Sequence, residues 1–153
     1  MYEAFFKLAE RPFAAAPLAS RYFPAAAIEN ARKTLTRCIE RAEGASLVIG
    51  PSGTGKSLLL QVLAEQFRQT FAVATLASGQ LGNRRGLLQA ILFELGLPYR
   101  GLEEGELRLS LYDHIAPGKT PSAGLLLLVD EAHRLPWRLM EELRMITNLA
   151  HDG

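Results

Sequence analysis

Three glycines, a lysine and a serine fall within the eight residues from Gly50 to Ser57, which read GPSGTGKS. They follow an apolar stretch, SLVI, and precede an amphipathic one. Glycines let the backbone curl so that successive N–H groups point inward and form a nest for phosphate oxygens. Gly50, Gly55, Lys56 and Ser57 satisfy the P-loop pattern G-x-x-x-x-G-K-[ST]. A turn before a helix would explain the glycines, but not the lysine and serine that follow.

The pattern predicts a site for a nucleoside triphosphate and Mg²⁺. The helix that begins at the loop adds the positive end of its dipole to the nest. We expect the Lys56 ammonium to reach the β- and γ-phosphates, and the Ser57 hydroxyl to ligate the Mg²⁺ that bridges them. The predicted nucleotide-binding residues are Gly50, Pro51, Ser52, Gly53, Thr54, Gly55, Lys56, Ser57 and Leu58.

A second stretch, LLLLVDEAH at residues 125–133, could supply the other half of a magnesium site. Asp130 ends an apolar run and can bind Mg²⁺ through water, as a Walker B aspartate does. Glu131 follows it and could orient and deprotonate an attacking water molecule. An ordinary acidic strand terminus is the alternative. The letters DEAH also occur in a class of helicases, but 153 residues are too few for the paired motor domains of that class.

The elements that must position these residues alternate along the chain. Apolar runs predict strands at 45–50, 71–77 and 125–130, the last buried on both faces. Helical spacing of apolar residues predicts helices over 26–42, from the GKS segment to about 68, and in three later segments. Residues 78–86 and 116–124 are predicted loops. Such alternation indicates an α/β fold, with a mainly parallel sheet sandwiched by helices. The apolar residues of the five predicted helices are Ile28, Ala31, Leu35, Cys38 and Ile39, then Leu59, Val62, Leu63 and Phe67, then Leu87, Leu88, Ile91, Leu92 and Leu95, then Leu107, Leu111 and Ile115, and last Leu139, Met140, Leu143 and Ile146.

Composition narrows the function classes. The chain is 48% hydrophobic and 22% charged, which is ordinary for a soluble globular protein. The formal net charge is +1, so bulk charge gives a nucleic-acid partner no support but does not exclude one. The first residues lack the pattern of a signal peptide, and the longest aliphatic run is too short to span a bilayer. The single cysteine, Cys38, fits a reducing compartment and is predicted to lie in the core.

Beyond these motifs, the opening MYEAFFKLAERPF and the later segment EELRMITNLA resemble the ExeA-type ATPases, also called general secretion pathway protein A. The resemblance implies an AAA+ (ASCE) P-loop NTPase that binds ATP with Mg²⁺. It implies Walker A roles for Lys56 and Ser57 and Walker B roles for Asp130 and Glu131, with Lys56 and Glu131 catalytic. It further implies a homo-oligomer and a secretion-system or membrane-protein partner. The implied location is the cytoplasm, with the inner face of a bacterial inner membrane as a further option.

In that family the strands of the sheet have the order 5-1-4-3-2, and the fourth strand carries the polar sensor residue. By this comparison, the chain ends before the fourth strand. We therefore expect an aromatic arm and helix at 1–44 and an incomplete AAA+ core at 45–153. Three functions stay open. The intact protein could hydrolyse ATP to drive assembly of a secretion-type complex, the chain could be a nucleotide-binding switch without turnover, or it could be a DNA-associated helper ATPase of transposition.

A few further residues have alternative roles. Phe13, Tyr22 and Phe23 in the arm could flank the adenine or belong to the core. Arg84 and Arg85 could face a neighbouring subunit or nucleic acid, although a solvated loop is favoured. Arg144 is predicted to form a salt bridge on a helix surface. His133 is predicted to be a surface or outer-shell histidine without a catalytic task.

Overall fold

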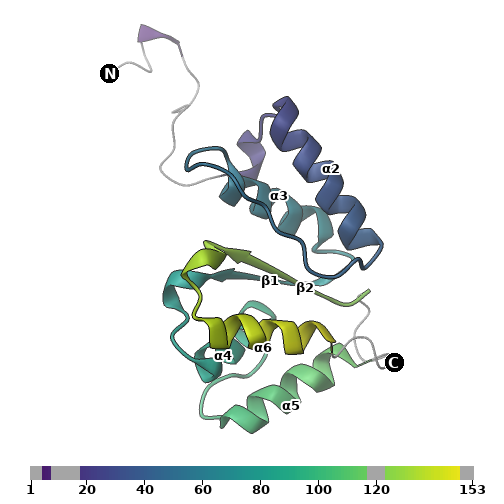
Figure 1. The fold of residues 1–153 in the computed structure, drawn as a ribbon, viewed down its shortest axis with the longest axis vertical. Helices are drawn as coiled ribbons and strands as arrows, with labels where there is room; N and C mark the ends of the chain where they lie inside the picture. Colours follow the sequence, from purple (N-terminus) through teal and green to yellow (C-terminus); the bar gives the residue numbers. More distant parts are fainter. Residues whose placement is uncertain (1–4, 8–17, 117–122, 149–153) are drawn as a thin grey trace.

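Two parallel strands lie at the centre of the fold, β1 (Ala72–Ala77) and β2 (Leu125–Asp130). Their register places Ala72 opposite Leu125 and Ala77 opposite Asp130. A computed structural model describes residues 5–7, 18–116 and 123–148 of the chain. Helices lie on both faces of the strand pair (Figure 1). The predicted α/β arrangement, a parallel sheet sandwiched by helices, is therefore confirmed.

One face of the sheet is covered by two helices, α2 (Ala26–Glu40) and α3 (Lys56–Phe67), preceded by the short 3-10 helix η1 (Ala19–Arg21). Their inner side chains and those of the strands form one apolar cluster. Leu59, Leu63 and Phe67 are buried in it, as their spacing predicts, whereas Val62 is only half-buried. Ile28, Leu35 and Ile39 of α2 pack against this cluster, but Cys38 is only half-buried and is not one of the buried core residues.

The opposite face carries three helices: α4 (Arg84–Glu94), α5 (Glu104–Ile115) and α6 (Trp137–Asn148). Two further 3-10 helices, η2 (Ser78–Gln80) and η3 (Ala132–Arg134), follow the carboxyl ends of the strands. Most of the predicted apolar positions of the three helices are buried in a second cluster with the sheet. Met140 is 42% exposed and is the clear exception among them.

A buried carboxylate, Glu142, fastens these three helices together. Its side chain is fully buried on α6 and is hydrogen-bonded by the Arg108 guanidinium from α5. Its other oxygen lies 3.4 Å from Nε of Arg84 on α4, within ion-pair range but without hydrogen-bond geometry. Glu142 lies on the inner face with Leu139 and Ile146, so the helical spacing could have revealed it. Its acidic side chain hid it from an apolar pattern.

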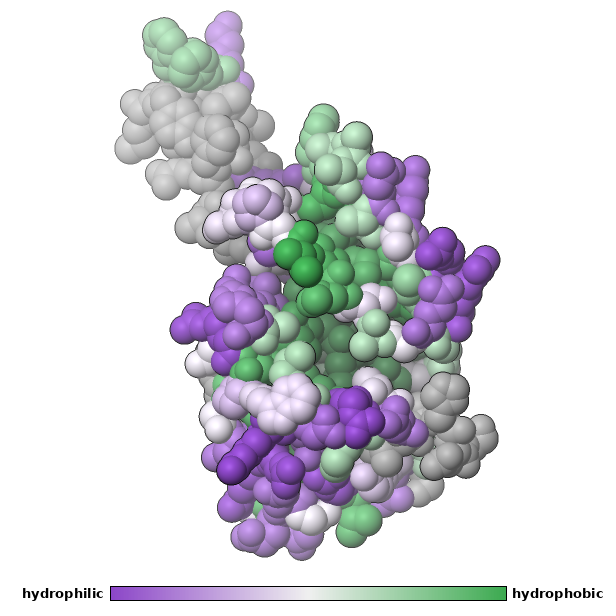
Figure 2. Space-filling view, viewed as in Figure 1, coloured by the Kyte–Doolittle hydropathy of each residue, from purple (hydrophilic) through white to green (hydrophobic). Residues whose placement is uncertain are grey.

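The predicted strand at 45–50 does not form. Leu47 is 75% and Ile49 is 86% exposed, and only Val48 packs against the core. A strand is held by hydrogen bonds to a neighbouring strand, and the described sheet contains only β1 and β2. Apolar side chains gather in the middle of the face seen in Figure 2, where Figure 1 places residues 45–50 and β2. The apolar sequence of residues 45–50 therefore indicated a propensity for strand, but no described strand pairs with this segment.

Two other predictions about the elements need correction. The 125–130 strand is not buried on both faces, because only Leu128 is buried and the other residues are half-buried. The predicted loop at 78–86 contains η2 and already ends at Asn83. There the Asn83 side chain accepts a 2.8 Å hydrogen bond from the Gly86 amide and caps α4. Arg84 and Arg85 thus belong to a helix and not to a solvated loop.

A candidate nucleotide-binding site

The loop from Gly50 to Gly55 adopts a conformation that depends on its glycines. Gly53 has a φ of +79° and Gly55 a φ of +87°, a region that L side chains rarely adopt. A Cβ on Gly50 would lie 3.3 Å from the Thr54 hydroxyl, so the backbone passes close to that side chain. The Thr54 hydroxyl in turn donates a 2.9 Å hydrogen bond to the Pro51 carbonyl. The loop is therefore folded back on itself, which brings its backbone groups together.

The Lys56 side chain lies across this loop. Its ammonium donates to the carbonyl oxygens of Gly50 at 2.9 Å and Pro51 at 2.7 Å. These are charge-assisted bonds to exposed acceptors, and their geometry holds a positive charge within the curl of the loop. An anionic ligand in the loop would meet this charge directly.

The loop leads directly into α3, which begins at Lys56. Gly55 is the N-cap residue and has no side chain to satisfy the first amides of the helix. Leu59 is the first residue whose amide bonds back into the helix, to the Gly55 carbonyl at 2.8 Å. The amides of Lys56, Ser57 and Leu58 precede it, in the turn where an α-helix supplies no acceptor. This donor set, with the Lys56 ammonium, matches the chemistry of phosphate oxygens, and the half-buried Ser57 hydroxyl begins the same turn.

The acidic pair lies at the carboxyl end of β2. Asp130 is the last residue of the strand and is half-buried, and its carboxylate accepts a 2.9 Å hydrogen bond from the Glu131 amide. Glu131 is half-exposed and its Oε2 lies 3.5 Å from Nε2 of His133. The 50–55 loop and the carboxyl ends of both strands lie on the same side of the molecule (Figure 1). Within the described residues, no hydrogen bond or ion pair joins the loop to the acidic pair, so a ligand between them would have to bridge the two.

Ser78 is a site residue that the sequence reasoning missed. It follows β1, is 3% exposed, and its hydroxyl donates a 2.7 Å hydrogen bond to the Glu131 backbone carbonyl. Glu131 has φ 53° and ψ 37°, a left-handed conformation that is costly for a residue with a Cβ. Ser78 thus ties the end of one strand to the strained residue after the other. A single serine after a strand has no spacing signal, so only the fold could reveal this contact.

Comparison with known proteins shows the family of this chain. The family described as AAA domain matches residues 39–153. The chain belongs to that family. This AAA-domain chain is 31% identical over 155 residues to General secretion pathway protein A of Aeromonas hydrophila, an alignment that covers 99% of the chain and 28% of that protein. The predicted resemblance is therefore confirmed.

A second relative is named for another process. The chain is 31% identical over 106 residues to the Mu-like prophage FluMu DNA transposition protein B of Haemophilus influenzae, which covers 69% of the chain and 34% of that protein. No solved structure matches this chain significantly. This AAA-domain chain thus spans about a third or less of the length of the two relatives. None of the helices in the described part is long and apolar enough to cross a membrane.

Residues outside the loop and the acidic pair have mixed outcomes in this AAA domain. Tyr22 is half-buried and donates to Glu29 at 3.0 Å, whereas Phe23 is 79% exposed and is not a core residue. Phe13 lies outside the described residues. Of the described arm aromatics, Phe5 and Phe6 contact each other and are exposed, so they do not dock onto the body.

The contacts of Arg144, His133 and Arg85 bear on the predictions made for these residues. Arg144 pairs with Glu141 one turn away at 2.5 Å, which confirms the predicted surface salt bridge. That pairing lowers the pKa of Glu141 and raises the pKa of Arg144. His133 is exposed, as predicted, and contacts Glu131. Arg85 donates to the Leu102 carbonyl at 2.9 Å, which braces the start of α4 against the segment before α5.

Proposed function

We propose that this AAA domain binds ATP with Mg²⁺ through residues 50–58 and hydrolyses it with Glu131 as the base. One observation carries the proposal: a loop with two left-handed glycines leads into an α-helix whose first amides have no side-chain cap, with the Lys56 ammonium held inside the curl. Backbone donors, a helix dipole and a fixed positive charge converge there. Phosphate oxygens are the acceptors that such a convergence recognises.

Each residue then has a defined task. The Lys56 ammonium would exchange its two carbonyl acceptors for phosphate oxygens, which carry more negative charge. Ser57 and Asp130 would hold the Mg²⁺, Ser57 from the first turn of α3 and Asp130 from the end of β2. When bound, Mg²⁺ neutralises charge on the phosphates. Glu131 would take a proton from the attacking water, while the bond between the γ-phosphorus and its bridging oxygen breaks and ADP leaves.

The process served by this chemistry is a proposal about the whole protein. Similarity over 99% of the chain to General secretion pathway protein A supports ATP-driven assembly of a secretion-type protein complex by a homo-oligomer. We place this homo-oligomer in the cytoplasm, with the inner face of a bacterial inner membrane as the alternative place. Similarity to a DNA transposition protein B supports a second candidate, a DNA-associated helper ATPase. Duplex DNA that raises the turnover of the whole protein severalfold would favour the second candidate, and no response would favour the first.

Binding is tested with a fluorescent ATP analogue titrated against the chain, with and without Mg²⁺. Removal of the Lys56 ammonium should cost about 2 kcal/mol or more, because a charged group opposite phosphate is lost. We therefore expect Lys56→Ala to bind at least about 30-fold more weakly. Lys33→Ala, which removes an exposed lysine on α2, is the matched control and should bind as the unsubstituted chain does. Equal affinity of Lys56→Ala and Lys33→Ala would refute the site.

Hydrolysis is tested separately in the whole protein. Glu131→Gln keeps the shape of the side chain and removes its basicity. We expect ATP binding to stay and phosphate release to fall about 10²- to 10⁴-fold. Turnover within about threefold of the unsubstituted protein would show that Glu131 is not the base, and would leave only the binding part of the proposal standing.

A further inference from the structure

Helix α2 reaches the candidate nucleotide site through Ile28. A Cβ built on Gly55 would lie 3.2 Å from Cδ1 of Ile28, so the tip of this isoleucine lies against the backbone of the residue that caps α3. Ile28 also packs with Leu35 and Ile39 against the apolar cluster beneath. Among these three side chains, Ile28 is the one that reaches the loop. The isoleucine therefore joins the core on one side and the phosphate loop on the other.

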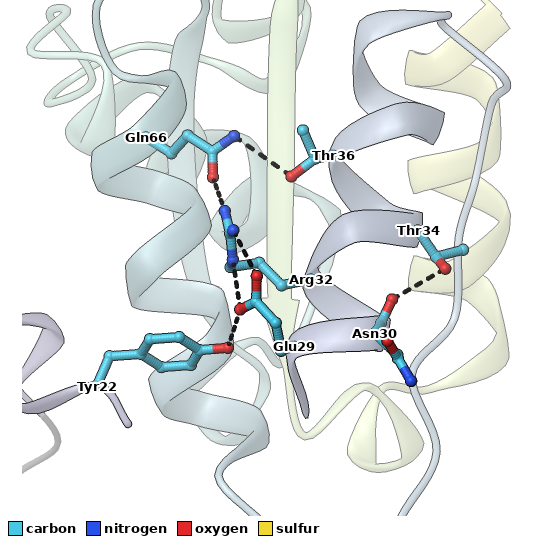
Figure 3. A network of polar contacts seen from close by, with 7 residues as sticks. All are labelled: Tyr22, Glu29, Asn30, Arg32, Thr34, Thr36 and Gln66. Carbon is cyan, nitrogen blue, oxygen red and sulfur yellow. Dashed lines mark hydrogen bonds and ion pairs between the residues drawn. The ribbon is translucent and has the colours of Figure 1, made fainter. Parts of the chain in front are cut away.

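A polar network fixes the place of α2 beside α3 (Figure 3). The Glu29 carboxylate accepts from the Tyr22 hydroxyl at 3.0 Å and from Nε and Nη2 of Arg32 at 3.0 and 2.7 Å. Arg32 also reaches across to α3, where Nη1 donates to Oε1 of Gln66 at 3.0 Å. The Gln66 amide donates back to the Thr36 hydroxyl at 3.3 Å. The network thus links Tyr22, the residue after η1, to α2 and α3. Its members Glu29 and Arg32 lie one residue and one helical turn from Ile28.

The contact matters because Gly55 has no Cβ to restrict it. At φ +87° it occupies one of several regions open to glycine, and a change of region at this residue would alter the orientation of the loop relative to the first amides of α3. A side chain pressed against it reduces those alternatives. When only a fraction of molecules has the competent loop, the apparent dissociation constant rises by the inverse of that fraction. Restriction of Gly55 therefore favours binding through preorganisation and needs no contact with the ligand.

We propose that Ile28 is a positioning residue for the nucleotide site, and that the Tyr22–Glu29–Arg32–Gln66 network holds it against Gly55. This inference rests on the proposed function, since it concerns ATP affinity at the same loop. It assigns to α2 a part in binding that neither the P-loop pattern nor the acidic pair contains. Arg32 acts through Ile28, so its effect should disappear when the Ile28 contact is absent.

The main test removes only the contacting atom. Ile28→Val deletes Cδ1 and leaves the rest of the side chain, and Ile39→Val makes the same deletion on the same face of α2, away from the loop. We expect the fluorescent ATP analogue with Mg²⁺ to bind Ile28→Val about threefold more weakly, and Ile28→Ala about tenfold more weakly, as the competent fraction falls. Ile39→Val and Ile39→Ala should bind within about 1.5-fold of the unsubstituted chain, although they lose comparable core contacts. Ile28→Leu, which keeps a terminal methyl group, should recover most of the affinity.

A double-substitution cycle tests the role of the network. Arg32→Ala should weaken binding about two- to threefold in the unsubstituted background and should have no further effect in Ile28→Ala. Equal affinities of the Ile28→Val and Ile39→Val variants would overturn the inference, as would an Arg32→Ala effect of the same size in both backgrounds. In either case a large loss on Lys56→Ala would leave the proposed function standing. If the unsubstituted chain shows no Mg²⁺-dependent binding, both the proposed function and this inference are wrong.

Discussion

The hydrogen bond from Ser78 to the Glu131 carbonyl opposes a local strain, and the two energies can be compared. A residue with a Cβ in the left-handed region costs about 1–2 kcal/mol, and Glu131 occupies that region at φ 53°. A single buried hydrogen bond contributes about 1 kcal/mol net. The Ser78 bond, at 2.7 Å, therefore offsets much of the strain. We expect Ser78→Ala to destabilise the fold and to release Glu131 from its left-handed conformation.

The loss of stability expected for Ser78→Ala depends on whether the Glu131 carbonyl has a second hydrogen-bond donor. The Glu131 oxygen also accepts from the Arg134 amide at 2.9 Å, so removal of the serine hydroxyl does not leave a buried acceptor unsatisfied. The free energy of unfolding should then fall by about 1 kcal/mol, and not by the roughly 3 kcal/mol of an orphaned group. A substitution at the strained residue itself, Glu131→Gly, should have the opposite effect on stability. It relieves about 1–2 kcal/mol of strain and loses about 0.4–1 kcal/mol because the unfolded chain becomes more flexible. It should raise stability by about 0.5 kcal/mol.

Urea unfolding at pH 7 with linear extrapolation measures both changes. Glu65→Gly on the exposed side of α3 is the matched control, because glycine in the interior of a helix costs about 1 kcal/mol. Glycine should therefore stabilise at position 131 and destabilise at position 65. The strain argument would be refuted if Glu131→Gly lowered stability as much as Glu65→Gly. A loss below about 0.3 kcal/mol for Ser78→Ala would show that its hydrogen bond contributes little.

Three further predictions concern stability. Ala42 has φ 50° at the end of α2, where its amide bonds to Ile39 and the next amide to Cys38, so Ala42→Gly should raise the free energy of unfolding by about 0.5–1 kcal/mol in the same urea assay. Hydrogen bonds from Arg32, and also from Tyr22, lower the pKa of Glu29 from 4.5 to about 2. The ionised Glu29 carboxylate therefore contributes to the stability of the fold above pH 4.5, and this contribution is lost as the pH falls from 4.5 towards 2. In that window the unfolding midpoint of Glu29→Gln should decline less steeply than that of the unsubstituted chain. Glu142→Ala leaves Arg108 without its buried partner and should cost about 3 kcal/mol or more. Glu141→Ala on the same helix removes only a surface ion pair and should leave the free energy of unfolding almost unchanged. A similar cost for both would contradict the burial argument.

The sequence predicted the features that depend on neighbouring residues. The start of α3 at Lys56 falls within the predicted GKS segment, because the P-loop pattern restricts backbone conformation locally. The helices were found because each has a periodic apolar face, and α4 ends where Gly96 takes a positive φ of 70°. Asp130 was placed at the end of a strand by the apolar run before it. Such signals are contained within about 15 residues of chain, so no knowledge of the fold was needed.

Features that depend on distant partners were missed. The 45–50 segment has the composition of a strand, but hydrogen-bond pairing is nonlocal and no described strand borders it. Arg84 was assigned to a solvated loop because its partner, Glu142, is far along the chain on another helix. Ser78 carries no pattern at all, since its partner is a backbone carbonyl after the other strand. In each case the sequence supplied the chemistry of one group and not the position of the other.

The two halves of the candidate site are held by different parts of the fold, and this makes their functions separable. The loop is seated by α2 through Ile28, on one face of the sheet. Glu131 is held by Ser78, through a contact between the ends of the two strands. No hydrogen bond or ion pair in the described chain connects these two supports. If the proposed function is right, changes at Ile28 should therefore alter the ATP dissociation constant with turnover of bound ATP unchanged. Changes at Ser78 should lower turnover with the dissociation constant unchanged, because only the geometry of the base is disturbed.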